Sequence, residues 1–345
     1  MKKKIAYHKC ALCQSAIANK TNSHIIPSFI ICKIASSDRS GRRNHELVYS
    51  IGKTIQAYAG NEVPIEEMEQ NFDDLSDERI NKELKVNPLS KDYIFCTSCE
   101  KALGDYLESP YASQKNINAE TTYFFWLSIL WRVGCFETFN NRIPKFILTE
   151  LRKSLNAYLQ ARKRGVNTNC VHQKYPFNYH IIYCKDYSID GNGFIYAEYD
   201  TFNRVFSITL GDIIICYNLK NGTLPDNYTF LGIEEDIKQA PSNDVRKSEG
   251  VKVVSKVVFT KAYDNLIEKV HMQYVNDKIV EIRRVWAELK QQHIVMPSPF
   301  PSDSFIKRCL EIMYDDKKKI GEKYTIKNFI TSFVKAFREI YCVNL

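Results

Sequence analysis

The chain has 345 residues, of which 44% are hydrophobic and 26% are charged, and its formal net charge is +8. This length allows two or three compact units with a sizeable core. The most apolar window, 123–131, is too short to span a bilayer, and no long apolar run follows the N-terminal lysines, so no signal peptide is expected. These features exclude a membrane-spanning protein and predict a cytoplasmic one.

The basic excess is concentrated at the start of the chain. Residues 1–53 contain ten lysines and arginines and two acidic residues. Their net charge of +8 equals that of the whole chain. Such a local excess favours a polyanionic partner, most commonly a nucleic acid. Lys33, Arg42 and Arg43 are the candidate phosphate contacts. A solvated arm that only aids solubility remains the alternative.

Two Cys-x-x-Cys pairs stand out among the 11 cysteines. Cys10 and Cys13 form the first pair, and Cys96 and Cys99 form the second, with Glu100 directly after it. Four thiolates in two such pairs suit one tetrahedral zinc ion, and in a reducing compartment metal binding is more common than disulfide formation. A chance pairing of buried thiols is the weaker interpretation.

The chain is predicted to begin with a hairpin around the first cysteine pair. This hairpin covers residues 1–34, places His24 on a strand and ends in the apolar run 25–34. Residues 62–83 are acidic and have few apolar anchors, which indicates an exposed, partly helical insertion. A strand at 93–95 precedes the second cysteine pair, and a helix over 100–107 follows it. This order is a treble-clef arrangement.

The rest of the chain changes from helices to strands and back. Residues 121–133 predict a buried helix, and 143–164 an amphipathic helix that Pro144 starts and Gly165 ends. Short Ile-, Val-, Tyr- and Phe-rich runs then predict an antiparallel sheet: 178–186, 193–200, 205–210, 212–219, 228–233 and 251–259. Apolar spacings of three and four predict the last helices: 262–292, 302–315 and 325–343.

These elements predict an α+β fold in three parts. Residues 1–120 would form a zinc-stabilised treble-clef unit with an acidic insertion at about 62–90. Residues 121–165 would form a helical connector, and residues 166–345 an α+β domain with an antiparallel sheet followed by helices. The role of this last domain does not follow from its sequence.

The N-terminal motifs resemble those of the HNH endonucleases, also called ββα-metal nucleases. The chain is most similar to a bacterial group with Cys-x-x-Cys, then Ser-His-Ile-Ile-Pro, which matches residues 23–27, then Cys-x-x-Cys-Glu. An apolar helix ending in Trp-Arg also occurs in that group, and Trp131 and Arg132 match it. The motif resemblance covers residues 10–108, with a weaker match to residue 132.

The resemblance implies roles for individual residues. His24 stands where the family has its general base, which deprotonates a water for attack on a phosphodiester. The four cysteines match the structural Zn²⁺ site of the zinc-bearing members. A catalytic Mg²⁺ or Mn²⁺ is implied as well, and it would neutralise the scissile phosphate.

Two positions depart from the usual motif. Many members have an aspartate before the histidine, where this chain has Ser23, and they place Asn or His at the start of the helix, where this chain has Glu100. Glu100 offers a hard oxygen ligand, or alternatively a carboxylate that complements the helix dipole. For His24 the alternative is a structural histidine bonded to backbone.

Two main functions follow as hypotheses. The first is a metal-dependent HNH-like endonuclease that cuts DNA, with RNA as the alternative substrate, in bacterial defence. The second is a catalytically degenerate zinc treble clef that binds nucleic acid or acts as an adaptor. In either case residues 133–345 are expected to offer a site for a regulatory protein or ligand.

Overall fold

The fold is described from a computed structural model. It describes these residues: 8–35, 89–114, 117–135, 143–168, 176–190, 195–220, 224–225, 228–294, 296–320 and 326–342. Within these ranges, no helix combines the length and the apolar character that crossing a bilayer requires. The fold contains both helices and strands, as expected for an α+β chain.

The chain forms two compact units. In the described residues, the first contains 8–35 and 89–263, and the second contains 264–342. The boundaries expected near residues 120 and 165 both fall inside the first unit, because its helices and sheet share one hydrophobic core. The division into three parts stays a prediction.

The first unit begins with a hairpin and a two-stranded sheet. Lys9 and Ile17 pair across the hairpin, and β1 (Ser23–His24) then pairs with β2 (Ser90–Lys91) in antiparallel register. The apolar run after His24 is a helix, α1 (Ser28–Ala35), and the carbonyl of Pro27 accepts the backbone N–H of Ile30.

A nearly continuous helix follows β2. It consists of α4 (Thr97–Leu103), a π-helical segment (Gly104–Glu108) and α5 (Ser109–Ser113). Pro110 has no N–H to donate and would crowd the carbonyl of Tyr106 in a regular α-helix. The wider π-helical turn, in which the N–H of Ser109 donates to the carbonyl of Gly104, accommodates it.

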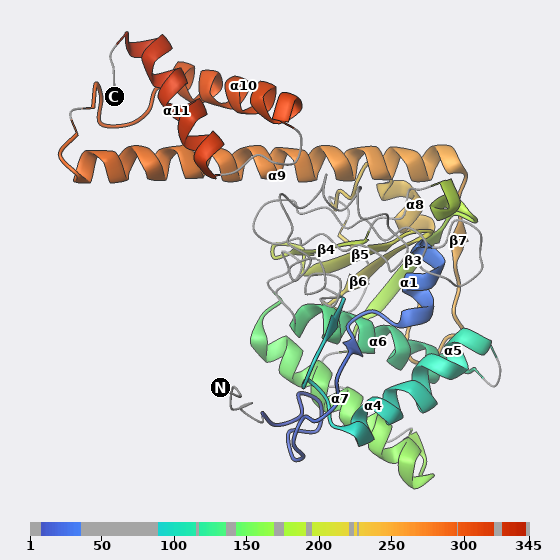
Figure 1. Cartoon of the computed structure of the whole chain (residues 1–345). Coiled ribbons are helices and arrows are strands. Elements are labelled where there is room, and N and C mark those ends of the chain that lie inside the picture. Colours follow the sequence, from blue (N-terminus) through green and yellow to red (C-terminus); the bar gives the residue numbers. More distant parts are fainter. Residues whose placement is uncertain are drawn as a thin grey trace. The chain divides into compact units, whose positions relative to one another are not determined.

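Helix α6 (Ala119–Cys135) is the centre of the first unit. Its residues from Thr121 to Val133 are all buried, as its aromatic composition predicts. Helix α7 (Lys145–Arg164) packs against it with one apolar stripe. Pro144 precedes α7, and Gly165 ends it in the left-handed conformation with φ +66°, as the sequence indicates. Figure 1 shows α6 between the sheet and the helices α4 and α7.

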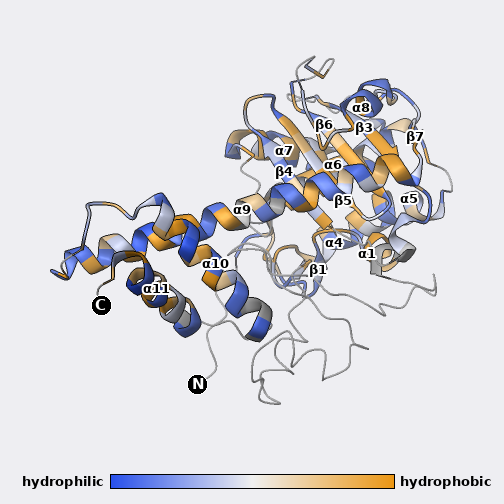
Figure 2. Ribbon diagram, turned by 90° about the horizontal axis from the view of Figure 1, so that it is seen from above, coloured by the Kyte–Doolittle hydropathy of each residue, from blue (hydrophilic) through white to orange (hydrophobic). Residues whose placement is uncertain are grey.

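A five-stranded sheet covers α6, in the order β4-β5-β6-β3-β7. Its strands are β3 (Asn178–Tyr183), β4 (Ile195–Asp200), β5 (Val205–Leu210), β6 (Ile213–Asn218) and β7 (Lys252–Val253). A 3₁₀ turn (Tyr187–Asp190) follows β3. The sheet is antiparallel except at its edge, where β7 pairs in parallel with β3. Figure 2 shows its strands as mainly hydrophobic, because both faces are buried.

Each face of the sheet belongs to a different core. An aromatic row of Tyr179, Tyr217, Phe206 and Tyr199 runs across four strands in register and faces α6. The Tyr217 hydroxyl donates to the carbonyl of Trp126 at 3.3 Å. The opposite face packs under residues 224–225 and 228–240, which include α8 (Glu234–Gln239).

Two predicted strands, 93–95 and 228–233, are absent from the described residues, and a third, 251–259, is shorter than expected. Residues 93–95 form a bend, and residues 228–233 form a loop with a turn at 231–232 whose side chains cover the second face of the sheet. Of 251–259, two residues form β7, and Lys256 already begins helix α9. Apolar β-branched runs of this length fit a covering loop or a buried helix as well as a strand.

A buried carboxylate fastens the loop before β7 to the core. The Tyr111 hydroxyl donates to Glu249 Oε1 at 2.9 Å, and the indole N–H of Trp126 donates to Oε2 at 2.6 Å. The Tyr179 hydroxyl lies 3.5 Å from Oε2. Burial raises the pKa of Glu249, although these donors oppose the shift. One carboxylate therefore connects α5, α6 and β3.

The raised pKa of Glu249 predicts a pH dependence of stability. A carboxyl group with a higher pKa in the folded than in the unfolded chain contributes stability below its unfolded value of about 4.5. That contribution is lost as the pH rises through the folded-state pKa. We expect Glu249→Gln to flatten the pH profile of the unfolding free energy in this range. Urea titrations of both proteins at several pH values measure this, and parallel profiles would contradict it.

The second unit is helical. It comprises most of α9 (Lys256–Gln291), together with α10 (Asp303–Ile320) and α11 (Ile326–Tyr341). The buried indole of Trp286 packs against Phe305 and Phe337, one from each of the other helices. The three helices expected at the end of the chain are therefore present.

Candidate metal centre and the histidine strand

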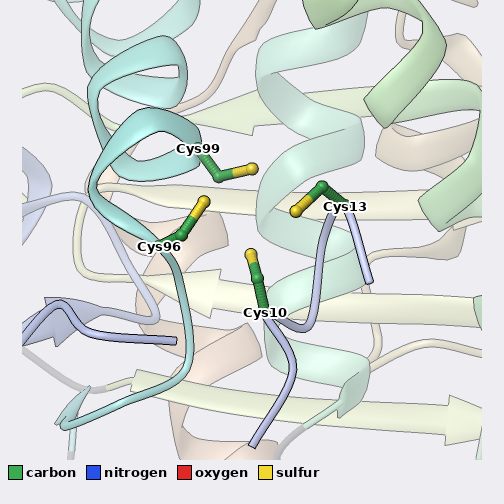
Figure 3. Close-up of side chains that lie close together, drawn as sticks. All are labelled: Cys10, Cys13, Cys96 and Cys99. Atoms are coloured by element: carbon green, nitrogen blue, oxygen red, sulfur yellow. The ribbon is translucent and has the colours of Figure 1, made fainter. Parts of the chain in front are cut away.

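The four paired cysteines come together in space. The sulfur atoms of Cys10, Cys13, Cys96 and Cys99 all lie within 4.8 Å of one another. Figure 3 shows the four side chains pointing toward a common centre. Cys13 is half-buried, and the other three are buried. Four sulfur ligands in this arrangement could bind one zinc ion.

Backbone hydrogen bonds shape the first cysteine turn. The N–H of Cys10 donates to the carbonyl of Ala16, and the N–H of Gln14 donates back to the carbonyl of Cys10 at 2.9 Å. Gln14 takes the left-handed conformation with φ 58°. A residue other than glycine pays a strain of about 1 kcal/mol there, so the tight turn is imposed by its surroundings.

The second cysteine pair opens helix α4. Cys96 is the N-cap residue with an extended backbone, and its carbonyl accepts the N–H groups of Cys99 and Glu100, each at 3.0 Å. The side-chain oxygen of Asn19 accepts both the N–H and the hydroxyl of Thr97. The hairpin of the first pair is thereby tied to the start of the helix that carries the second.

The cluster favours a cation electrostatically. The neighbouring Cys99 thiol lowers the pKa of Cys10, whereas the pKa of Cys99 is raised. Of these two sulfurs, that of Cys10 therefore loses its proton more readily. A bound Zn²⁺ favours the thiolate form of each of its ligands.

His24 lies on strand β1, between the two cysteine pairs in the sequence. It is half-buried, its strand partner is Ser90, and Ser23 before it is fully buried. The N–H of Ile25 donates to the carbonyl of Leu89 at 2.7 Å, so the backbone on either side of His24 is held by the β2 segment.

A buried arginine holds the carbonyl of His24. One guanidinium nitrogen of Arg132 donates to the His24 oxygen at 2.9 Å and to Glu108 at 2.8 Å. Its other nitrogens donate to the carbonyl and hydroxyl of Ser128. Arg132 is only 2% exposed, so α6, the π-helical segment and β1 meet at one buried charge. The sequence offered a signal for this contact, because a lone arginine in an apolar helix needs a buried partner.

Removing that charge is expected to destabilise the first unit. Arg132→Met would leave the Glu108 carboxylate and the His24 carbonyl without their donor, at a cost of about 3–5 kcal/mol. Arg132→Lys keeps the charge but not the planar fork, so we expect a smaller loss. Urea unfolding measures both, with the exposed Arg164→Met as the control. A fully stable Arg132→Met protein would contradict the role given to this contact.

Glu100 is half-buried and lies beside Ser23, the residue that precedes His24. Burial raises its pKa, and the nearby Ser23 hydroxyl and Arg132 charge partly oppose this. The contact with Ser23 does not reach hydrogen-bond geometry: Ser23 Oγ and Glu100 Oε2 are both buried without a hydrogen-bond partner. Two such polar atoms side by side indicate a place for a further polar group.

The remaining predicted site residues are less well placed or lie outside the described residues. Among the described side chains, the four cysteines are the one group of three or more His, Cys, Asp or Glu residues that could share an ion, and neither His24 nor Glu100 belongs to it. The side chain of Lys33 lies outside the described residues, as do Arg42, Arg43 and nearly all of the acidic insertion at 62–90.

No family model, curated protein or solved structure matches this chain. The proposed function therefore rests on the motifs and the geometry of the site.

Proposed function

We propose that this protein is a metal-dependent endonuclease of the HNH type, built on a zinc-stabilised treble clef. The observation that supports it best is the position of His24. His24 lies on strand β1, which pairs with β2, and Arg132 donates to its backbone carbonyl. The preceding residue, Ser23, lies beside Glu100 in the first turn of α4, the helix that begins at the second cysteine pair. DNA is the favoured substrate, and a role in bacterial defence rests on the motif resemblance alone.

The proposed reaction assigns one role to each group. His24 takes a proton from the attacking water, because an imidazole has a pKa near neutrality. Glu100 would hold a Mg²⁺ or Mn²⁺ ion together with water and phosphate oxygens, since such ions prefer oxygen ligands. That ion would neutralise charge on the scissile phosphate. Cys10, Cys13, Cys96 and Cys99 hold the structural zinc and take no part in the reaction.

Plasmid nicking tests the proposal. Purified protein is incubated with supercoiled DNA in Mg²⁺, in Mn²⁺ and in EDTA, and single-stranded DNA and RNA of the same sequence are offered in parallel. The proposal expects cleavage that requires the added ion. Cleavage that persists in EDTA would contradict it, and preferential cutting of RNA would change the substrate.

The alternative is a zinc treble clef that binds nucleic acid, or acts as an adaptor, without cutting. Ser23 in place of the usual aspartate favours it, as does the lack, among the described residues, of a group of His, Asp or Glu side chains that could hold an ion together with Glu100. Zinc-loaded protein that binds DNA but leaves it intact in every metal would support this alternative. A regulatory protein or ligand bound through residues 133–345 is compatible with either function.

A further inference from the structure

Helix α7 brings positive charge to the metal centre. It contains six lysines and arginines and one acidic residue, Glu150. Arg152 donates to the carbonyl of Leu12 inside the first cysteine turn at 2.9 Å. Three turns later, Lys163 donates to the hydroxyl of Ser98 inside the second turn, also at 2.9 Å. One face of α7 therefore lies along both cysteine pairs.

The end of α7 forms an exposed basic patch with α4. Ser98, Lys101, Lys163 and Arg164 are all exposed, and we call these four residues the Ser98 patch. Lys101 lies one helical turn after Ser98 on α4, and Lys163 reaches the same hydroxyl from α7. None of the three basic side chains forms an ion pair with a carboxylate of the described residues. By contrast, Lys153 on the same helix is paired with Glu150.

We propose that the Ser98 patch binds the phosphate backbone of a nucleic acid. Lysine and arginine side chains beside a serine hydroxyl are the donor set that contacts phosphate oxygens in protein–DNA complexes. Cations at the end of a helix also complement its dipole, but that effect is worth at most about 1 kcal/mol at an exposed site. It does not explain why Lys163 contacts another helix at Ser98, or why Lys101, in the middle of a helix, lies beside it.

This surface lies outside the N-terminal arm to which the sequence assigns the phosphate contacts. The inference rests on the proposed function in taking DNA as the polyanion, but it concerns binding and not cleavage. A zinc ion would hold the turn that carries Ser98 against the first cysteine turn, which Arg152 of α7 also contacts.

The test compares two triple variants with the same loss of charge. Lys101→Gln, Lys163→Gln and Arg164→Gln together remove the basic side chains of the patch. Lys307→Gln, Lys327→Gln and Lys335→Gln remove three exposed lysines of the second unit. Binding of full-length protein to a 30-base-pair duplex is measured by fluorescence anisotropy over a salt series. Zinc content and unfolding midpoint establish that both variants are folded.

We expect the patch variant to bind DNA about 10- to 100-fold more weakly at 0.1 M salt. Its plot of log K against log salt should be shallower by about two to three units, since each phosphate contact contributes about 0.9. The control variant should keep the wild-type affinity and slope. Unchanged binding by the patch variant, or an equal loss in the control, would overturn the inference.

The two proposals fail separately. Protein that binds DNA through the patch in every metal but never cuts it contradicts the nuclease alone. Protein that cuts DNA and whose patch variant binds normally contradicts this inference alone. Wild-type protein that ignores DNA but binds anionic lipid vesicles through the same side chains would also overturn it.

Discussion

Purified protein is expected to carry one zinc ion per chain, and Cys96→Ser to lose both the ion and the folded first unit. Four sulfurs within 4.8 Å of one another could bind a zinc ion without further ligands. Structural zinc of this kind supplies an apparent 10–16 kcal/mol at neutral pH. That equals or exceeds the total stability of a typical domain, about 5–15 kcal/mol. The loss should therefore unfold the unit and not merely weaken it.

The shared core determines how far that loss spreads. Cys10, Cys96 and Cys99 belong to the same hydrophobic cluster as α6 and the sheet face that contains Tyr217. Thermal unfolding of the first unit should then show a large fall in midpoint, whereas the matched replacement Cys184→Ser, at a buried cysteine directly after β3, should cost about 1–3 kcal/mol. Metal analysis and circular dichroism measure both. A metal-free wild type with a fully folded Cys96→Ser variant would refute the zinc site.

His24→Ala is expected to reduce plasmid cleavage by about 10²- to 10⁴-fold, the usual contribution of a general base. The imidazole should matter for the reaction and little for the fold, because His24 is only half-buried and its contact with Arg132 uses the backbone carbonyl. DNA affinity and zinc content should therefore stay at the wild-type values. His8→Ala, an exposed histidine before the first cysteine pair, is the matched control and should cleave normally.

The outcome separates the two functional hypotheses. Cleavage that needs both an added metal and His24 would establish the nuclease and leave its ligands to be assigned, with Glu100→Gln as the next variant. Cleavage that survives His24→Ala would mean that another residue is the base or that a contaminant cuts the DNA. A zinc-loaded wild type that binds but never cuts would favour the binding or adaptor role.

The sequence predicted most clearly the features whose residue patterns are compatible with few structures. Two Cys-x-x-Cys pairs indicate one cluster, whatever lies between them, and the structure brings all four sulfurs together. Helix α7 has an unbroken apolar stripe, with Pro144 before it and Gly165 after it. Each of these signals depends on residue spacing or on a backbone restriction. Its meaning therefore does not depend on the tertiary contacts of the residues.

Short apolar runs were predicted less well. The apolar run after His24 forms helix α1, and residues 228–233 form a loop that covers the sheet. An apolar run can be buried in any backbone conformation, so its composition alone does not select one. The parallel pairing of β7 with β3 could not be read locally either. The contact between Arg132 and His24 joins residues 108 positions apart, and no local pattern specifies such a partner.

The separation of the two cysteine pairs has a consequence for the length of the chain between them. The cluster brings Cys13 and Cys96 together. The pairing of β1 with β2 likewise brings together residues that are more than 60 positions apart in the sequence. The entropy lost when a flexible loop is closed depends only on the logarithm of its length, so halving or doubling the loop changes the free energy by about 0.6 kcal/mol. Zinc binding at about 10 kcal/mol or more outweighs that change many times over. A change in the number of residues between Cys13 and Cys96 is therefore expected to leave the four cysteines able to bind zinc.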